Sequence, residues 1–125
     1  MFLTVETVLV IHRRMTAEFG GDDGIRDRGL LESATAMPRQ QFGGRYLHAG
    51  LPEQAAAYLF HLCRNHAFVD GNKRTALATA EFFLLLNGAR LDATNDELIE
   101  LTVGVADGSI DKDVVTKFFT EHVEA

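Results

Sequence analysis

The apolar residues of the N-terminal segment recur every three or four positions between Thr4 and Phe19. Such spacing places them on one face of a helix, so it predicts an α-helix over residues 4–19. A run of glycine and aspartate over residues 20–24 follows directly and is typical of a turn. The residues on the predicted inner face are Val5, Val8, Leu9, His12, Met15 and Phe19.

The same periodicity predicts three further helices, over residues 27–37, 52–65 and 72–86. Asp27 has the carboxylate of an N-cap, and Pro38 would end the helix that Asp27 opens. Pro52 suits the first turn of the next helix because that position needs no N–H donor. Asn87 and Gly88 follow the last of the three and are typical of a C-terminal cap.

The helices predicted over 52–65 and 72–86 carry apolar residues on almost every side. Helices of that kind lie inside a protein, so we expect both in the middle of a bundle. The spacing Thr94-x-x-Glu97 is a capping box and predicts a fifth helix that ends at Gly108. A sixth helix is predicted from Asp111 to Val123, with four residues facing inward: Val114, Val115, Phe118 and Phe119.

Residues 39–50 are the exception, because they contain glycines and no helical pattern. We expect a mobile surface loop there, with a short hairpin over 39–47 as the alternative. No other stretch alternates in the manner of a β-strand. The sequence therefore predicts an all-α fold: one domain over residues 1–125, built as a compact bundle of about six helices.

The 125 residues include 46% hydrophobic ones, which is enough to bury the core of one ordinary domain. The formal net charge is −6, and no cluster of lysine and arginine offers the positive surface that nucleic-acid binding needs. Cys63 is the single cysteine, so no internal disulfide can form. No apolar stretch is long enough to span a bilayer. We expect a cytoplasmic protein that binds neither nucleic acid nor a membrane directly.

The most informative stretch runs from His66 to Arg74, between the two central helices. His66 is a possible base, Asp70 is a ligand suited to a hard cation, and Gly71 permits a tight turn. Polar and cationic residues then open the next helix: Asn72, Lys73 and Arg74. The free N–H groups and positive dipole end of a helix favour a phosphate. The combination is typical of phosphoryl or nucleotidyl transfer, which depends on positioning and charge.

Each of these residues also has an ordinary structural interpretation. A lone histidine at the end of an apolar helix is more often structural than catalytic. Asp70-Gly71 alone is a common turn, and polar residues at a helix start are usually solvated. The combination at fixed spacing favours the catalytic interpretation. Even there we interpret Phe68 as structural, an apolar anchor that holds the loop onto the core.

Two other patterns are weaker. Cys63 and His66 lie three residues apart, as zinc ligands can, but no second pair of ligands accompanies them, so we do not expect a zinc site. Glu18, Asp22 and Asp23 lack the ligand spacing of a calcium loop. We assign that acidic cluster no role.

The residues from 66 to 74 resemble the signature of the Fic/Doc family, His-x-Phe-x-Asp/Glu-Gly-Asn-Gly/Lys-Arg, in its Doc form. The resemblance extends over essentially the whole chain and includes His12, Gly20-Gly21, residues 24–34, Pro38 and Asn87-Gly88. It implies the all-helical Fic fold and transfer of part of ATP to a hydroxyl of another protein. By that resemblance His66 is the general base and Asp70 holds Mg²⁺. The residues implied to hold the ATP phosphates are Gly71, Asn72, Lys73 and Arg74.

Two departures separate the chain from the AMP-transferring members of the family. Lys73 stands where those enzymes have a second glycine, and Leu77 stands where they have a further arginine. Similar changes in Doc toxins accompany a reversed nucleotide, which brings the γ-phosphate to the reacting position. The resemblance thus implies a kinase that modifies a serine or threonine, with elongation factor Tu as the expected target and adenylyl transfer as the alternative.

The resemblance also implies how the activity is controlled. Many Fic proteins block their own site with a helix carrying Ser/Thr-x-x-x-Glu-Gly/Asn, and no glutamate in this sequence precedes a glycine or an asparagine. Inhibition is therefore expected from a partner, a small antitoxin of the prevents-host-death type.

Two other classes of function compete with this interpretation. A ribonuclease toxin would use His66 with Arg64 or Arg74, but the acidic charge and the absence of the helical Arg-x₄₋₆-His spacing argue against it. A non-catalytic module that only binds an antitoxin needs neither a base nor a metal ligand. The presence of both His66 and Asp70 argues against that second class.

Overall fold

A computed structural model describes all 125 residues and confirms the all-α class, with six α-helices and only two short strand pairs. The helices are α1 (Val5–Phe19), α2 (Arg28–Ala36), α3 (Leu51–Asn65), α4 (Asn72–Leu86), α5 (Asn95–Asp107) and α6 (Lys112–His122). A 3₁₀ turn, η1 (Met37–Arg39), extends α2. The strands are β1 (Gln41–Phe42), β2 (Arg45–Tyr46), β3 (Arg90–Leu91) and β4 (Val123–Glu124).

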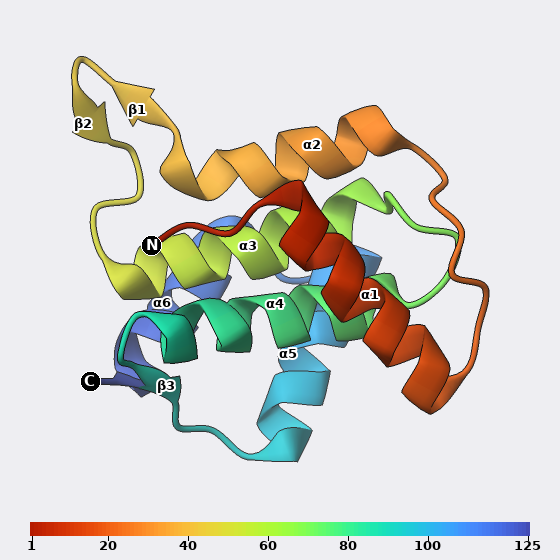
Figure 1. Ribbon diagram of the computed structural model, residues 1–125. Helices are drawn as coiled ribbons and strands as arrows, with labels where there is room; N and C mark the ends of the chain where they lie inside the picture. The colour runs from red at the N-terminus through yellow and green to blue at the C-terminus, as the bar shows by residue number, and fades with distance from the viewer.

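Helix α3 is the centre of the bundle. It packs against α2, α4, α5 and α6, and Figure 1 shows it crossing the middle of the molecule with α2 on one side and α4 on the other. Its small residues allow neighbouring helices to approach closely, and Tyr58 fills the core beside Phe83 with ring centroids 5.0 Å apart. The Tyr58 hydroxyl accepts the backbone N–H of Leu3 at 2.8 Å. The fully buried small residues are Ala55, Ala56 and Ala57.

The expected burial of α4 on every side is only partly correct. Its inner face contributes Ala76, Ala80, Phe83 and Leu84 to the core, but an outer face leaves Leu85 65% exposed. The reason is geometric, because α4 contacts α1, α3, α5 and the short strand β3, and these leave part of its surface uncovered. Two further apolar residues are exposed on α4: Phe82 and Leu86.

For helix α6, the predicted inward orientation is wrong at one position. Val115 and Phe119 are fully buried and Phe118 is partly buried, as expected, but Val114 is exposed. Val114 is in the first turn of α6, beyond the edge of the face that packs on α3.

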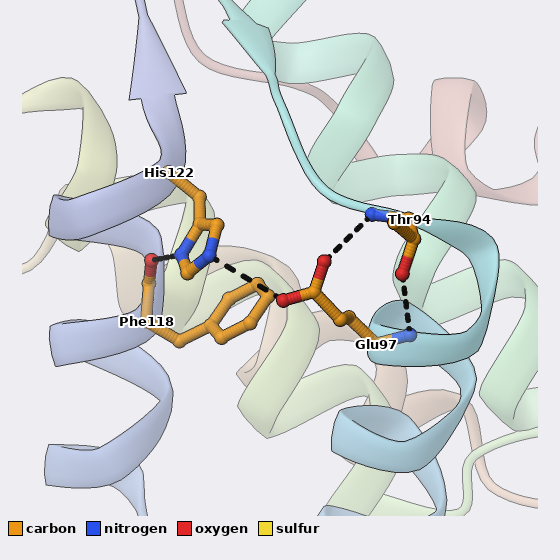
Figure 2. A network of polar contacts seen from close by, with 4 residues as sticks. All are labelled: Thr94, Glu97, Phe118 and His122. Atoms are coloured by element: carbon orange, nitrogen blue, oxygen red, sulfur yellow. Dashed lines mark hydrogen bonds and ion pairs between the residues drawn. The ribbon is translucent and has the colours of Figure 1, made fainter.

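Capping chemistry sets the helix starts where the sequence predicted it. The Asp27 side chain accepts the N–H of Leu30 at 3.0 Å, at the start of α2. Figure 2 shows the capping box of α5, in which Thr94 and Glu97 each accept the backbone N–H of the other. Hydrogen bonding from the backbone N–H and the hydroxyl of Thr94 lowers the pKa of the Glu97 carboxyl. The same carboxylate lies 3.7 Å from His122 Nε2 on α6, an ion pair when the imidazole is protonated.

The stretch over residues 39–50 contains the hairpin that was the alternative there. Strands β1 and β2 pair antiparallel around Gly43 and Gly44, whose positive φ angles of 61° and 79° suit a tight two-residue turn. The hairpin lies at the far end of α3 from the connection between α3 and α4 (Figure 1). None of the helices is both long and apolar enough to cross a bilayer.

Candidate functional site

The loop over residues 66–71 joins the two central helices and includes His66 and Asp70, the predicted base and metal ligand. His66 ends α3 in the left-handed conformation, with φ 48° and ψ 49°, and its side chain is exposed. Gly71 precedes α4 with φ 77°, a conformation that favours glycine. Positive φ angles at both ends of this short loop turn the chain sharply, and the His66 and Asp70 side chains stay exposed while Phe68 is buried.

Phe68, the predicted anchor of this loop, is buried, with only 2% of it exposed. Its ring stacks on the ring of His12, with the centroids 3.7 Å apart and the planes 9° apart. His12 Nε2 lies 2.8 Å from the carbonyl oxygen of Asp70, so that nitrogen carries the hydrogen. The sequence placed His12 on the inner face of its helix without assigning it a role, and a polar residue on an apolar face was the signal.

The Asn72 side chain closes the loop from inside. Its Oδ1 accepts the N–H of Phe68 at 3.0 Å, and its Nδ2 donates to the carbonyl of Phe68 at 2.9 Å. Both ends of the amide are thus used within the loop. Its one remaining side-chain hydrogen and its backbone N–H are what Asn72 can offer to a phosphate.

The segment over residues 21–27 forms the other side of the loop. Val69 donates its N–H to the carbonyl of Gly24 at 3.0 Å, and Ile25 and Phe68 form an antiparallel β-bridge. The N–H of Asp22 donates to the Asp70 carboxylate at 2.9 Å. Sequence reasoning predicted only a turn here, because these contacts join residues more than 40 positions apart.

Gly21 permits the close approach of this segment to Asp70. Its φ is 110°, and a Cβ there would lie 3.1 Å from the Asp70 Cβ. A larger residue at position 21 would therefore move Asp70 or the turn.

A cavity of about 300 Å³ opens beside the loop, between the first turn of α4 and α5. It is lined by Gly71, Asn72, Lys73, Arg74, Leu77, Ile99, Thr102 and Val103. The structure thus brings the four predicted phosphate-binding residues together on one wall. His66 and Asp70 lie on the adjoining loop and do not line this cavity.

The first turn of α4 lines the cavity and has backbone N–H groups without partners. The first helical hydrogen bond of α4 runs from the N–H of Thr75 to the carbonyl of Gly71, so the N–H groups of residues 72–74 have no acceptor in the helix. No side chain caps them. The Lys73 and Arg74 side chains are exposed beside them. The Arg74 guanidinium lies 4.4 Å from the centroid of the Phe19 ring, and Phe19 is exposed at the end of α1 instead of facing inward as predicted. The arrangement concentrates positive charge at a place where an anion can accept hydrogen bonds from several N–H groups.

Cys63 lies in the core, away from the exposed His66 side chain. It is buried, its thiol lies 3.6 Å from the carbonyl oxygen of Thr102, and burial raises the pKa of the thiol to about 11. No three histidine, cysteine, aspartate or glutamate side chains converge to hold a metal ion.

Comparisons with known proteins identify the same family as the sequence of the loop does. Residues 2–84 match the model of the Fic/DOC family. The chain is 50% identical over 78 residues to Toxin Doc of Mycolicibacterium smegmatis, and the aligned part is 62% of this chain and 60% of that toxin. It is 34% identical over 108 residues to Protein kinase doc of Escherichia phage P1, which covers 86% of this chain and 84% of the phage protein. The chain thus spans less than two thirds of the first relative's length but most of the second's.

Proposed function

Because this chain belongs to the Fic/DOC family, we propose that it is a Doc-type toxin that transfers the γ-phosphate of ATP to a serine or threonine hydroxyl of another protein. The names of its two relatives, a toxin and a protein kinase, support this activity. The runner-up is transfer of AMP to the same kind of hydroxyl.

The open first turn of α4 is the observation that carries the proposal. Three backbone N–H groups without partners and two exposed cations, Lys73 and Arg74, belong to residues that line one cavity. Such a set binds a polyphosphate through hydrogen bonds, side-chain charge and the helix dipole together. The apolar cavity wall formed by Leu77, Ile99 and Val103 offers a surface for the less polar part of a nucleotide.

His66 is the proposed general base. Its imidazole is exposed on the loop and has no hydrogen-bond partner within the protein, so a ring nitrogen is available to accept a proton. As His66 takes the proton of the target hydroxyl, the hydroxyl oxygen bonds to the γ-phosphorus. The bond from that phosphorus to the bridging oxygen breaks, and ADP leaves with the electron pair.

Asp70 is the proposed ligand of Mg²⁺. One of its carboxylate oxygens accepts the N–H of Asp22, and the other has no partner in the protein. Mg²⁺ commonly binds through one carboxylate together with phosphate oxygens and water, and this single exposed carboxylate beside a phosphate site fits that habit. When bound there, Mg²⁺ would neutralise charge on the phosphate oxygens. Asp70→Asn should remove the magnesium dependence of ATP binding in calorimetric titrations.

Lys73 and Leu77 favour γ-phosphate transfer over AMP transfer. Both line the cavity, so a lysine side chain fills space that a glycine would leave open, and an apolar side chain stands where an arginine would hold a phosphate. The phosphates are then expected to lie in the reversed order, with the terminal one nearest His66.

Elongation factor Tu in the cytoplasm is the proposed target, on the basis of the family resemblance, and its modification would arrest translation and growth. The proposed inhibitor is a small antitoxin of the prevents-host-death type, which would fold against the site as it binds. Production of this chain alone in bacteria should arrest growth, and co-production of the antitoxin should restore it. Normal growth of cells that contain the folded protein would contradict the toxin proposal.

Label transfer tests the reaction itself. Parallel reactions contain the purified protein, magnesium, a bacterial extract and ATP labelled at either the γ or the α phosphate. We expect protein-bound γ label, lost in His66→Ala. Protein-bound α label would instead establish AMP transfer and rule out the kinase, and ATP left intact together with degraded RNA would indicate a ribonuclease.

A further inference from the structure

The backbone of His66 needs something to hold it. It is the only residue other than glycine with a positive φ, and side chains with a Cβ rarely adopt that conformation. Such a residue stays in place only when its surroundings determine it. His66 also lies at the end of α3, where the last carbonyl groups of a helix have no intrahelical donor.

Arg26 meets both needs from outside the loop. Its Nε donates to the carbonyl oxygen of His66 at 2.7 Å, and its Nη2 donates to the carbonyl oxygen of Asn65 at 3.2 Å. The planar guanidinium is suited to two parallel hydrogen bonds of this kind, which a lysine cannot make. Its positive charge also lies at the negative end of the α3 dipole.

Arg26 is itself firmly placed. Its backbone N–H and that of Asp27 both donate to the carbonyl of Ala67, at 2.8 and 3.0 Å. Asp27 is in turn the N-cap of α2. No acidic side chain pairs with the Arg26 guanidinium. The backbone of Arg26 therefore links the start of α2 to the loop. Its guanidinium binds the backbone carbonyl groups of Asn65 and His66.

We propose that Arg26 is a positioning residue, which fixes the left-handed backbone of His66 and so aims its imidazole at the reacting hydroxyl. The inference rests on the proposed role of His66 as the base. Arg26 touches the backbone of α3 and not the phosphate-binding turn of α4. Its loss is therefore expected to slow the chemical step and to leave ATP binding unchanged.

The alternative is that the exposed Arg26 binds ATP or the target directly. A direct contact would raise the KM for ATP or for the target when Arg26 is replaced, and Arg26→Lys would largely preserve it because the charge remains. A positioning role depends on the two-pronged hydrogen bond, so Arg26→Lys should lose most of the effect as well.

The test compares Arg26→Ala, Arg26→Lys and Arg26→Gln with Arg28→Ala, a nearby exposed arginine whose side chain makes no hydrogen bond or ion pair. In the γ-label assay we expect kcat to fall about 10- to 100-fold in the three Arg26 variants. The KM for ATP should stay within about twofold, and Arg28→Ala should behave as wild type. Unchanged kcat, or a raised KM with unchanged kcat, would overturn the proposal.

A second measurement does not depend on activity. In protein labelled with ¹³C and ¹⁵N at histidine, the backbone shifts of His66 report its φ and ψ, and they should leave their left-handed values in Arg26→Ala. If Arg26→Ala does not fold, Arg26→Lys and Arg26→Gln supply the same comparison. If His66→Ala retained transfer, the proposed role of His66 as the base would be wrong. The His66 backbone shifts would still show whether Arg26 fixes the His66 backbone. Unchanged His66 shifts in folded variants would overturn the positioning role alone.

Discussion

The two connections at the ends of α3 are both on the surface, yet they are held in different ways. Before α3, the hairpin β1–β2 is fixed by two residue pairs and a glycine turn, and Phe42 at its tip is 84% exposed. After α3, the loop over residues 66–71 is tied to α1, to residues 22–27 and to α4 through Asn72. The hairpin relies mainly on its own strand pairs and turn, with one ring contact between Tyr46 and Phe2, whereas several distant segments of the chain hold the loop through hydrogen bonds. The comparison indicates that exposed polar side chains belong to a functional site when several distant segments fix the backbone that carries them.

Removal of the His66 imidazole should have the largest effect and should separate function from stability. His66→Ala is expected to lower γ-label transfer by about 10²- to 10⁴-fold, because general base catalysis contributes that much. Its melting temperature should stay within a degree or two of the wild type, since the side chain is exposed. Phe42→Ala, the matched change in the hairpin, should alter neither quantity. Wild-type transfer by His66→Ala would show that this histidine is not the base.

Phe68→Ala should break the loop from beneath. The ring is 2% exposed and stacked on His12, so its loss should reduce the free energy of unfolding by about 3–5 kcal/mol. Phe42→Ala removes a phenyl ring from the hairpin and should lower the free energy of unfolding by less than about 0.5 kcal/mol. Urea unfolding followed by circular dichroism measures both. Equal effects of the two changes would mean that the loop is no better anchored than the hairpin.

A pH titration sharpens the comparison through two histidines outside the loop, His48 and His61. Burial, with help from Lys112 and His48, lowers the pKa of His61 on α3 from 6.5 to about 4. Burial also lowers the pKa of His48, just after the hairpin, and Glu53 partly opposes that shift. In the unfolded chain His61 binds a proton below about pH 6.5, whereas in the folded protein it stays neutral until about pH 4. Stability is therefore full above pH 6.5 and falls as the pH drops through that window.

The shift at His61 corresponds to roughly 3 kcal/mol, of which solvent screening should leave about 1–2 kcal/mol. Replacing His61 by asparagine should remove that part of the pH dependence between 6.5 and 4. Urea unfolding at several pH values measures it in both proteins. Identical slopes for wild type and variant would show that His61 is freely protonated in the folded state.

The smallest expected effect concerns the stacking of Arg74 on Phe19. The guanidinium lies 4.4 Å from the ring centroid, and Phe19 is half exposed, so the contact is worth about 0.5–1 kcal/mol. Phe19→Ala should raise the KM for ATP about two- to fivefold because Arg74 becomes less well placed, while kcat changes little. Phe19→Tyr keeps the ring face and should restore the wild-type KM. Failure of tyrosine to restore it would point to a different role for position 19.

Local chemistry explains what the sequence predicted well. Asp27 and Thr94 act on N–H groups three residues away, so the starts of α2 and α5 could be identified without knowledge of the fold. The residues from His66 to Arg74 are contiguous and occur in a recognisable order, so the loop was found as a unit.

Long-range packing explains what the sequence could not give. His12 and Arg26 reach the loop across 58 and 40 positions, and no local pattern reveals such partners. The exposure of Leu85 and Val114 depends on which neighbouring helix covers each side, which apolar composition does not tell. The roles of His66, Asp70 and the residues over 71–74 stay predictions until the variants are measured.

The order of the elements along the chain has a consequence for synthesis. Everything that shapes the loop, from His12 to Asn72, has been added by the time α4 is made, whereas Ile99, Thr102 and Val103 on the second wall of the cavity belong to α5 and come later. Because a chain emerges from the ribosome with its N-terminal part first, a nascent chain that stops after α4 would carry its reactive loop beside half a cavity. We therefore expect the capacity to hold a nucleotide to be acquired only after α5 has been made.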